Sequence, residues 1–281
     1  MNYKYKDGRI FVNPLIGCSG GYSYCYLIRE LEDFSKVRKN KYSINDMISM
    51  IKKDDRFILG REGTIISIGS YCDIFPLNNK EFRDFSLEWI SKLLQIGNPV
   101  QIISKNKLPL EKILEIKKSI KFENQLLYST TITSFSNYEK IEKNSSSLGE
   151  RLITSMQFKK NGIPTNLMIK PFIPKLTKVD LDKFKNTISS NYFDYVVVGE
   201  LYITKNSLSS GEVRVLDCTE NQKYEIIEGK ELDTFFYEIS KNTNKVYRKS
   251  SCVNANLLKV QNLSYINLKK ENLCIDCGNC K

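Results

Sequence analysis

The sequence predicts an α/β protein built as a partial (β/α)6 TIM-like barrel that is followed by a C-terminal extension. Six short runs rich in Ile, Val and Leu are typical of parallel strands buried on both faces. They span residues 10–15, 64–69, 100–104, 126–132, 165–169 and 195–199. Segments with helical spacing of apolar residues separate them, and β/α units in series imply a parallel sheet with right-handed crossovers.

Two of the intervening helices have clear ends. The helix predicted over residues 82–94 is followed by Gly97, and the helix predicted over 147–160 stops at Asn161-Gly162-Ile163-Pro164. A flavodoxin-like, doubly wound sheet is the structural alternative. In both arrangements the chemistry is expected at the C-terminal ends of the strands.

The alternation of strand-like apolar runs with helical segments weakens after residue 205. Residues 232–239 look helical, residues 246–258 are ambiguous, and residues 274–281 are dominated by cysteine. We therefore expect the barrel to occupy residues 1–205 and the extension to occupy residues 206–281.

Composition narrows the class of protein. The chain has 281 residues, of which 41% are hydrophobic and 27% charged, as is ordinary for a globular protein. No apolar run approaches the ~20 residues of a membrane span, and the N-terminus lacks a signal peptide, so we expect a cytoplasmic protein without membrane association. The absence of histidine excludes histidine acid–base catalysis and histidine metal ligands. Any transition-metal site must be built mainly from cysteine.

The net charge of +11 indicates an anionic partner such as DNA or RNA. A competing explanation is AT-rich coding, which enriches Lys, Asn and Ile without selection for binding. The basic residues are dispersed rather than clustered, so both explanations stay open. The oligomeric state is not predicted.

Three of the eight cysteines form a motif near the C-terminus. Cys274, Cys277 and Cys280 read C-x2-C-x2-C, the compact triplet of bacterial-type ferredoxins without their fourth cysteine and proline. The motif predicts a second 4Fe–4S cluster, with zinc or a reactive, disordered tail as alternatives. The fourth ligand would be Cys252 or Cys218, or one iron would stay open.

The N-terminal loop is the most informative segment. In NPLIGCSGGYSYCYL, Cys18 and Cys25 follow the first predicted strand, and nearby glycines supply backbone freedom. Two buried structural cysteines are the plain alternative. The loop resembles the cluster loop of the radical S-adenosylmethionine superfamily, in which C-x3-C-x2-C holds three irons of a 4Fe–4S cluster and leaves the fourth for the cofactor. This resemblance makes Tyr24 the aromatic residue that lies along the adenine, and it puts Tyr22 in the place of the middle cysteine.

The resemblance continues over residues 10–200. Segments 67–77, 102–105, 128–132, 142–152 and 162–177 are similar, in order, to segments of the spore-photoproduct-lyase-like branch. The resemblance implies that Ser70 and Asp73 lie near the cofactor's amino group. It implies that Ser129 and Arg151 lie near its ribose or carboxylate. Asp73 and Arg151 would otherwise be cap or surface ion-pair residues.

Two positions depart from this pattern. Tyr22 lacks the thiolate of the middle ligand. Ser70 stands where spore photoproduct lyase has a hydrogen-donating cysteine, and Cys72 lies beside Asp73 instead. Repair of spore DNA damage is therefore not supported by its own diagnostic residue.

Three interpretations of Tyr22 stay open. Its phenolate could ligate iron, although a phenol pKa near 10 resists ionisation. A remote thiol, with Cys72 as the candidate, could complete a site at Cys18 and Cys25. In the third interpretation the loop has lost its cluster.

The resemblance implies a radical S-adenosylmethionine enzyme. A reduced cluster, fed by an electron donor such as flavodoxin or ferredoxin, would cleave S-adenosylmethionine to a 5′-deoxyadenosyl radical. That radical would abstract hydrogen from an unidentified substrate, with nucleic acid as a candidate. The alternative is a degenerate, non-catalytic scaffold that binds nucleic acid or a partner protein and keeps a structural metal cluster at its C-terminus.

Overall fold

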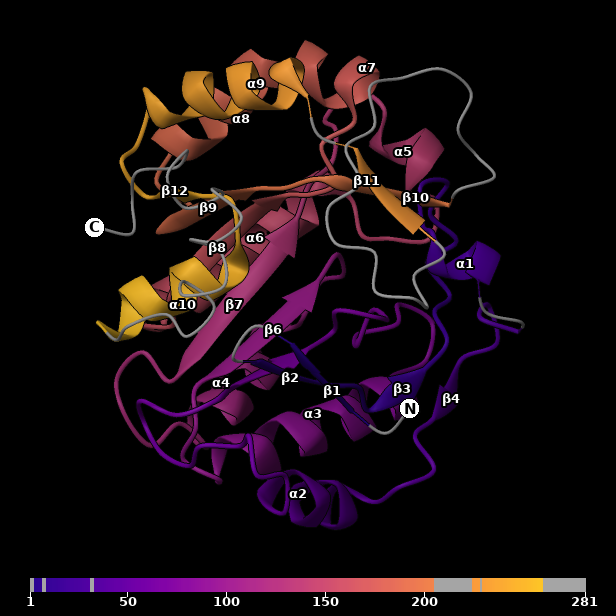
Figure 1. The fold of residues 1–281 in the computed structure, drawn as a ribbon, viewed down its shortest axis with the longest axis vertical. Helices are drawn as coiled ribbons and strands as arrows, with labels where there is room; N and C mark the ends of the chain where they lie inside the picture. Colours follow the sequence, from indigo (N-terminus) through magenta and orange to yellow (C-terminus); the bar gives the residue numbers. More distant parts are fainter. Residues whose placement is uncertain (1–2, 7–8, 31–32, 205–223, 228, 260–281) are drawn as a thin grey trace.

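A computed structural model describes the chain except for residues 1–2, 7–8, 31–32, 205–223, 228 and 260–281 (Figure 1). Its centre is an eight-stranded sheet with the order β1-β2-β5-β6-β7-β8-β9-β12. In that order the strands are Lys4–Lys6, Arg9–Val12, Ile65–Ile68, Val100–Ser104, Leu126–Thr131, Thr165–Ile169, Tyr195–Val198 and Val246–Tyr247. β1 pairs antiparallel with β2, and each later pair in the sheet is parallel.

The predicted α/β fold class is confirmed. All six predicted strands are present, with ends that differ by a few residues. From β2 onward the strands lie in the sheet in the order in which they occur along the chain. In a doubly wound sheet the order of the strands reverses at a switch point. The strand order here does not reverse, so the sheet is singly wound and barrel-like, and the flavodoxin-like alternative is excluded.

The first predicted strand is divided in two. β2 ends at Val12, and β3 (Leu15–Ile16) leaves the main sheet to pair antiparallel with β4 (Arg38–Lys39). Pro14 lies between them and has no amide hydrogen to donate to a ladder. The break sends the chain from the sheet into the cysteine loop.

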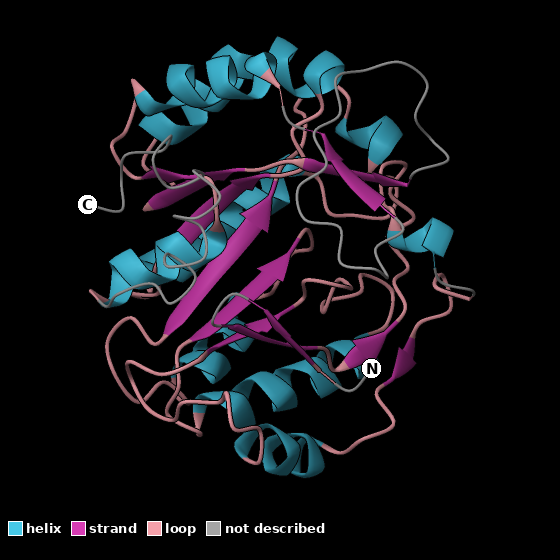
Figure 2. Ribbon diagram, viewed as in Figure 1, coloured by secondary structure: helices cyan, strands magenta, loops and turns pink. Residues whose placement is uncertain are grey.

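Helices cover the outer face of the sheet (Figure 2). The longer ones are α2 (Ile44–Lys52), α3 (Lys80–Leu94), α4 (Leu110–Lys117), α6 (Leu148–Lys160), α8 (Leu181–Ser189) and α9 (Lys230–Ser240). The loops between these elements also contain the short helices α1 (Leu27–Glu30), α5 (Tyr138–Ile141) and α7 (Pro174–Thr177) and the 3-10 helix η1 (Lys178–Asp180). Tyr128 of β7 and Phe158 of α6 illustrate this packing, because their rings stack with centroids 4.0 Å apart.

The ends of α3 and α6 follow the sequence signals. Gly97 and Gly162 adopt φ values of +94° and +76°, the left-handed conformation in which glycine ends a helix without a steric cost. At the start of α6, Ser147 and Glu150 form a reciprocal capping box. The cap fixes where α6 begins and so places Arg151 in its first turn.

The final helix lies on the opposite face. Val196, Val198 and Val246 pack in the cluster that contains the α9 side chains, whereas Tyr195 and Tyr247 pack with residues of α10 (Ser250–Leu258). Successive side chains of a strand point to opposite faces, so α10 covers the inner face of the sheet (Figure 1). The chain beyond residue 205 therefore returns to the same sheet through β12 and α10.

A separate two-stranded hairpin, β10 (Leu201–Thr204) with β11 (Tyr224–Ile227), completes the described strands. Among the described residues, no helix combines the length and the apolar character that crossing a membrane requires.

Candidate functional site

Asp73 joins three segments at the carboxyl-terminal ends of the strands. Its carboxylate accepts hydrogen bonds from the Ser104 hydroxyl and from the Lys105 amide, both at 2.8 Å, and so holds the end of β6. Its own amide donates to the Cys18 sulfur at 3.4 Å. The cysteine loop, the end of β5 and the end of β6 are therefore fixed to one another through a single residue.

The loop around Cys18 is shaped by glycine and by backbone hydrogen bonds. Gly17 has φ +83°, and a Cβ atom there would lie 2.4 Å from the Lys36 carbonyl oxygen, so the turn requires glycine. The Cys18 sulfur also accepts from the Gly20 amide at 3.4 Å. Burial raises the pKa of the Cys18 thiol, while the amide donor of Asp73 acts to lower it. Two N–H donors on one sulfur provide an environment that suits a metal-bound thiolate.

Tyr22 packs inside this loop as a neutral phenol. A Cβ atom at Gly20 would lie 2.6 Å from Cζ of Tyr22, and the Tyr22 ring stacks on Tyr24 with centroids 5.9 Å apart. Its hydroxyl is buried and has no hydrogen-bond partner among the described residues. Burial, followed by the charge of Asp73, raises the pKa of Tyr22 well above its ordinary value. Without a metal ion in the loop, the phenolate form of Tyr22 is therefore disfavoured.

A buried ion triad lies beside the loop. The Glu142 carboxylate is 3.2 Å from Nζ of Lys105 and 2.6 Å from Nη1 of Arg151, and its side chain is fully buried. Burial alone would raise the pKa of Glu142, but the charges of Lys105 and Arg151 outweigh it and lower that pKa. Burial lowers the pKa of Lys105 to about 8, although Glu142 acts to raise it.

The triad is connected to the aromatic pair of the loop. The Tyr24 hydroxyl donates to Oε1 of Glu142 and accepts from the Thr133 hydroxyl at 3.3 Å. The Lys105 ammonium lies 5.4 Å from the ring centroid of Tyr22 and 5.8 Å from that of Tyr24. Lys105 and Glu142 thus belong to this site, although the sequence provided only the segments in which they lie.

The guanidinium group of Arg151 forms its hydrogen bonds with groups of the protein itself. Its guanidinium is fully buried and donates to the backbone oxygens of Thr131 and Ser146, both at 2.9 Å, as well as to Glu142. Because β7 ends at Thr131, Arg151 ties α6 to the end of that strand. A contact between Arg151 and the cofactor stays a prediction.

The two predicted serines lie at different depths. Ser70 follows β5 on the same strand end as Asp73, and its hydroxyl oxygen is 3.1 Å from that of Ser67. Ser129 is buried within β7, where it accepts hydrogen bonds from the amides of Gln101 at 2.9 Å and Asn166 at 3.1 Å. Gln101 in turn accepts from Asn254 of α10. Ser129 therefore belongs to an internal amide network that also docks α10.

The structure describes three of the remaining cysteines, and the others lie outside the described residues. Cys25 is a free, half-buried thiol whose pKa is raised by burial. Cys72 is buried, and its thiol donates to the Leu15 carbonyl oxygen at 3.3 Å. Cys252 is a buried residue of α10. The other predicted metal ligands, Cys274, Cys277 and Cys280, lie outside the described residues, as does Cys218.

These positions decide how well the loop fits an iron–sulfur cluster. Cys18 and Cys25 are free thiols on a glycine-shaped loop, and they fit. Tyr22 fits the middle position poorly, because a phenol has a higher ordinary pKa than a thiol and burial raises it further. Within the described part of the chain, no group of three Cys, Asp, Glu or His side chains is arranged to hold a metal ion. A third thiolate would have to come from a rearranged Cys72 or from cysteines beyond the described residues.

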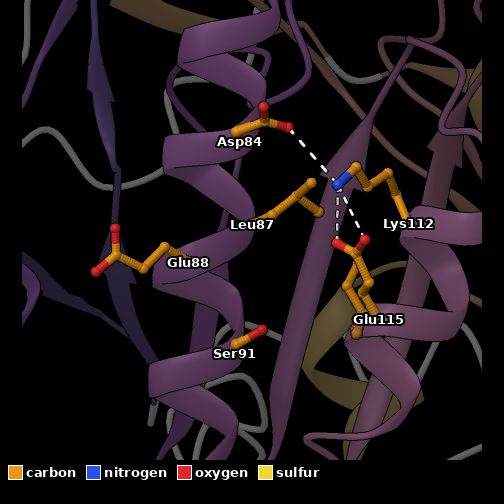
Figure 3. A pocket seen from close by; sticks show the side chains of 7 residues that line it. Asp84, Leu87, Glu88, Ser91, Lys112 and Glu115 are labelled. Atoms are coloured by element: carbon orange, nitrogen blue, oxygen red, sulfur yellow. Dashed lines mark hydrogen bonds and ion pairs between the residues drawn. The ribbon is translucent and has the colours of Figure 1, made fainter.

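A surface pocket of about 210 Å³ lies elsewhere, between α3 and α4 (Figure 3). Lys112 bridges Glu115 at 2.9 Å and Asp84 at 3.9 Å on its rim. The pocket lies on the outer helical layer, away from the strand ends, and its lysine is paired with two of its three carboxylates. We assign this pocket no role in the candidate site.

The sequence matches no protein-family model and no curated protein. Solved structures do match. Spore photoproduct lyase complexed with dinucleoside spore photoproduct is 14% identical with a TM-score of 0.61, over 83% of this chain and 74% of the lyase. A lyase variant with bound AdoMet and the same photoproduct is 13% identical with a TM-score of 0.62, over 85% of this chain and 75% of the lyase.

A second enzyme shares the fold. The radical S-adenosylmethionine methyltransferase TsrM of Kitasatospora setae, with tryptophan and a SAM analogue bound, is 9% identical. Its TM-score is 0.51, over 85% of this chain and 53% of TsrM. The chain therefore has the TIM-like fold that these radical SAM enzymes share, as the sequence resemblance implied. At these identities the likeness is one of fold, and the chemistry must be argued from the residues of the site.

Proposed function

We propose that this chain is a radical SAM-type iron–sulfur protein that binds S-adenosylmethionine at the carboxyl-terminal ends of β5 to β8. The observation that carries the proposal is the placement of Asp73, which holds the Cys18 loop and the end of β6 together. A cofactor that contacts both a cluster and the strand ends needs this arrangement. The fold shared with SAM-binding enzymes supports it.

Asp73 has the capacity to bind the amino group of the cofactor. Its Oδ1 accepts from Ser104 and from the Phe75 amide, and its Oδ2 accepts from the Lys105 amide. An ionised carboxylate offers about four acceptor positions, so one is left on Oδ2 for an ammonium donor. Ser70, on the same strand end, is proposed as its neighbour in this contact.

The other roles follow from the positions of the side chains. Tyr24 would lie along the adenine, with its ring orientation fixed by its bond to Glu142. Arg151 would support the ribose or carboxylate side through the end of β7, and Ser129 would act from inside the strand. These contacts define where the cofactor would sit, and the substrate stays unidentified.

Cys18 and Cys25 would hold the cluster, which when bound supplies the electron for reductive cleavage of the cofactor. Because Tyr22 is a neutral phenol, we propose that the third thiolate comes from elsewhere in the chain. Cys72 is one candidate, because it directly precedes Asp73, whose amide bonds to the Cys18 sulfur. Burial raises the pKa of the Cys72 thiol well above its ordinary value, so iron binding would have to displace that proton. The C-terminal triplet Cys274, Cys277 and Cys280, for which we otherwise propose the second cluster, is the other candidate. A cysteine that it gave to the loop would leave two for that second cluster. Electrons would come from a flavodoxin or ferredoxin.

The test is formation of 5′-deoxyadenosine by anaerobically reconstituted protein, given reductant and S-adenosylmethionine. The proposal expects the product from the unchanged chain and its loss in Cys18→Ala and Cys25→Ala. Ser19→Ala serves as the matched control, because it changes an exposed residue of the same loop without removing a thiol. Product that is equally abundant without Cys18 would contradict the proposal.

A degenerate, non-catalytic scaffold is the second candidate. The observation that favours it is Tyr22, whose ring fills the loop without reaching a hydrogen-bond partner among the described residues. This candidate predicts that S-adenosylmethionine or a partner binds without iron in the loop. Calorimetric binding of the cofactor to iron-free protein, together with no 5′-deoxyadenosine, would favour the scaffold.

A further inference from the structure

A second charged cluster lies at the ends of the last strands of the sheet. Lys170 directly follows β8, Glu200 follows β9, and Lys249 lies between β12 and α10. Carboxyl ends of neighbouring parallel strands meet at the same edge of a sheet. The cluster is made of residues that the proposed cofactor site does not use.

Glu200 is a buried carboxylate with incomplete compensation. It is 0% exposed, and its two oxygens lie 3.7 Å from Nζ of Lys170 and 3.7 Å from Nζ of Lys249. Hydrogen bonds from ammonium groups are about 2.7–2.9 Å long, so both pairs are ionic contacts only. Neither oxygen accepts a hydrogen bond from another described residue.

Glu200 is nevertheless fully ionised at neutral pH. Burial alone would raise the pKa of Glu200, but the charges of Lys249 and then Lys170 outweigh it and hold the pKa at about 2. A buried anion whose counter-ions make no hydrogen bond to it is costly to maintain. Its persistence indicates that the surrounding positive charge is strong enough to hold an anion at this place.

The positive groups converge from separate elements. The side chain of Lys170 crosses Gly199, where a Cβ atom would lie 2.9 Å from its Cδ, so glycine at 199 leaves room for the lysine. Lys249 is the cap residue of the nine-residue α10 and makes no side-chain cap bond, which leaves the positive N-terminal end of the helix at the cluster. Arg248 adds Nε and Nη1, which are buried and have no hydrogen-bond partner within the described part of the chain, while its Nη2 donates to Asp233.

We propose that Lys170, Lys249 and the N-terminus of α10 form a subsite for a phosphate group of a nucleotide or nucleic-acid substrate, with Glu200 as the internal counter-ion that the phosphate replaces. Lysine ammonium groups and helix N-termini are the groups that proteins use to bind phosphate. Lys170 and Lys249 are partly exposed, at 28% and 19%, so they are reachable from solvent. A phosphate subsite here makes a nucleotide or a nucleic acid the substrate of the proposed radical SAM function. This assignment of the substrate rests on that proposed function.

The experiment measures binding of a dye-labelled single-stranded oligodeoxynucleotide to the full chain by fluorescence anisotropy. Lys170→Ala and Lys249→Ala are each expected to weaken binding by about tenfold, and to reduce its salt dependence, because each removes a phosphate contact. Glu200→Gln is expected to strengthen binding, because it removes the competing anion. Lys160→Ala, an exposed lysine at the end of α6, is the matched control and should bind like the unchanged chain.

The opposite sign for Glu200→Gln separates this proposal from a purely structural ion cluster. If Glu200 only holds the lysines in place, its replacement weakens binding along with the lysine variants, and the proposal is wrong. Unchanged affinity for the oligonucleotide in both lysine variants would also contradict the proposal. Lys170→Arg and Lys249→Arg keep the charge and should keep binding, which guards against loss through misfolding.

Competition distinguishes the source of the phosphate. Inorganic phosphate that displaces the oligonucleotide at millimolar concentration would show a site for a free phosphate or nucleotide, whereas resistance to it would show that the polymer backbone is bound. Binding is measured without iron or S-adenosylmethionine. Its failure therefore leaves the radical SAM proposal standing, and failure of 5′-deoxyadenosine formation leaves the phosphate subsite standing.

Discussion

The sulfur of Cys18 and the backbone nitrogen of Asp73 lie 3.4 Å apart and form a hydrogen bond. This bond joins the loop that follows β3 to the end of β5, while the Asp73 carboxylate holds the end of β6. The geometry of the candidate site therefore depends on Asp73 twice, through its main chain and through its side chain. The predictions below separate these contributions from those of the neighbouring charges.

Asp73→Ala is expected to weaken both the fold and cofactor binding. It leaves the Ser104 hydroxyl and the Lys105 amide without their acceptor, and hydrogen bonds to a charged group contribute about 1.5–3 kcal/mol each. Urea denaturation measures the loss of unfolding free energy, and calorimetry measures S-adenosylmethionine binding. Asp84→Ala, at an exposed ion pair, is the control and should change neither. Full cofactor affinity in folded Asp73→Ala would rule out the proposed contact.

Glu142→Gln is expected to be strongly destabilising. The change leaves two buried cations, Lys105 and Arg151, without their shared counter-charge, and breaking a buried pair in this way costs about 3–5 kcal/mol. The free energy of unfolding in urea provides the measurement. Glu115→Gln breaks an exposed pair with Lys112 and serves as the control. A change in Glu142→Gln as small as that of the control would show that the triad does not hold the site together.

The titration of Lys105 is expected to add to the unfolding free energy as pH rises above 8. Its pKa is lowered from 10.5 to about 8 in the folded chain, chiefly by burial. Between these two values the unfolded chain holds the proton and the folded chain does not, so the unfolding free energy rises by at most about 1.4 kcal/mol per pH unit. Below pH 8 both states hold the proton and this rise is absent.

The measurement is urea denaturation from pH 7 to roughly 9.5, below the pH at which unfolded tyrosines ionise. The buried thiols, whose pKa values are raised in the folded chain, lower the unfolding free energy over the same range and do so in every variant. Lys105→Met should therefore have a less positive slope with pH than the unchanged chain, and Lys92→Met, which removes an exposed lysine of α3, should have the same slope as the unchanged chain. Identical slopes for the two variants would contradict the assignment.

Tyr22 can be tested by two substitutions with different expected results. Tyr22→Phe removes a buried hydroxyl without a partner among the described residues, so the unfolding free energy should rise by about 1 kcal/mol while loop iron is unchanged. Tyr22→Cys restores a thiol at the middle position, so it should increase the iron retained after gel filtration. Iron lost in Tyr22→Phe would instead identify the phenolate as a ligand.

Much of the fold could be predicted from the sequence, because strands and helix ends are marked by residues that are close together along the chain. The apolar runs gave all six predicted strands, and Gly97 and Gly162 marked the ends of their helices. β12 was missed because a two-residue strand has no period to recognise, and the helix after it was ambiguous because α10 is apolar around much of its surface. Short elements of this kind are defined by the sheet they join.

The site was readable only in part, because its connections are long-range. Cysteine spacing and the Asp73 segment identified the loop and the strand end that the structure brings together. Nothing local in the sequence pairs Glu142 with both Lys105 and Arg151, or directs the Cys72 thiol to the Leu15 carbonyl instead of to the loop. Those relations arise when separate strands converge at one edge of the sheet.

The most direct test of the central claim is the iron and sulfide content per chain after anaerobic reconstitution, compared between the unchanged protein and a Cys18→Ala/Cys25→Ala variant. A cluster held by the loop predicts that the variant loses the iron and sulfide of one cluster. A Cys277→Ala variant then reports separately on iron at the C-terminal triplet. Equal iron in the unchanged protein and in the loop variant would contradict the claim that a cluster is bound at Cys18 and Cys25.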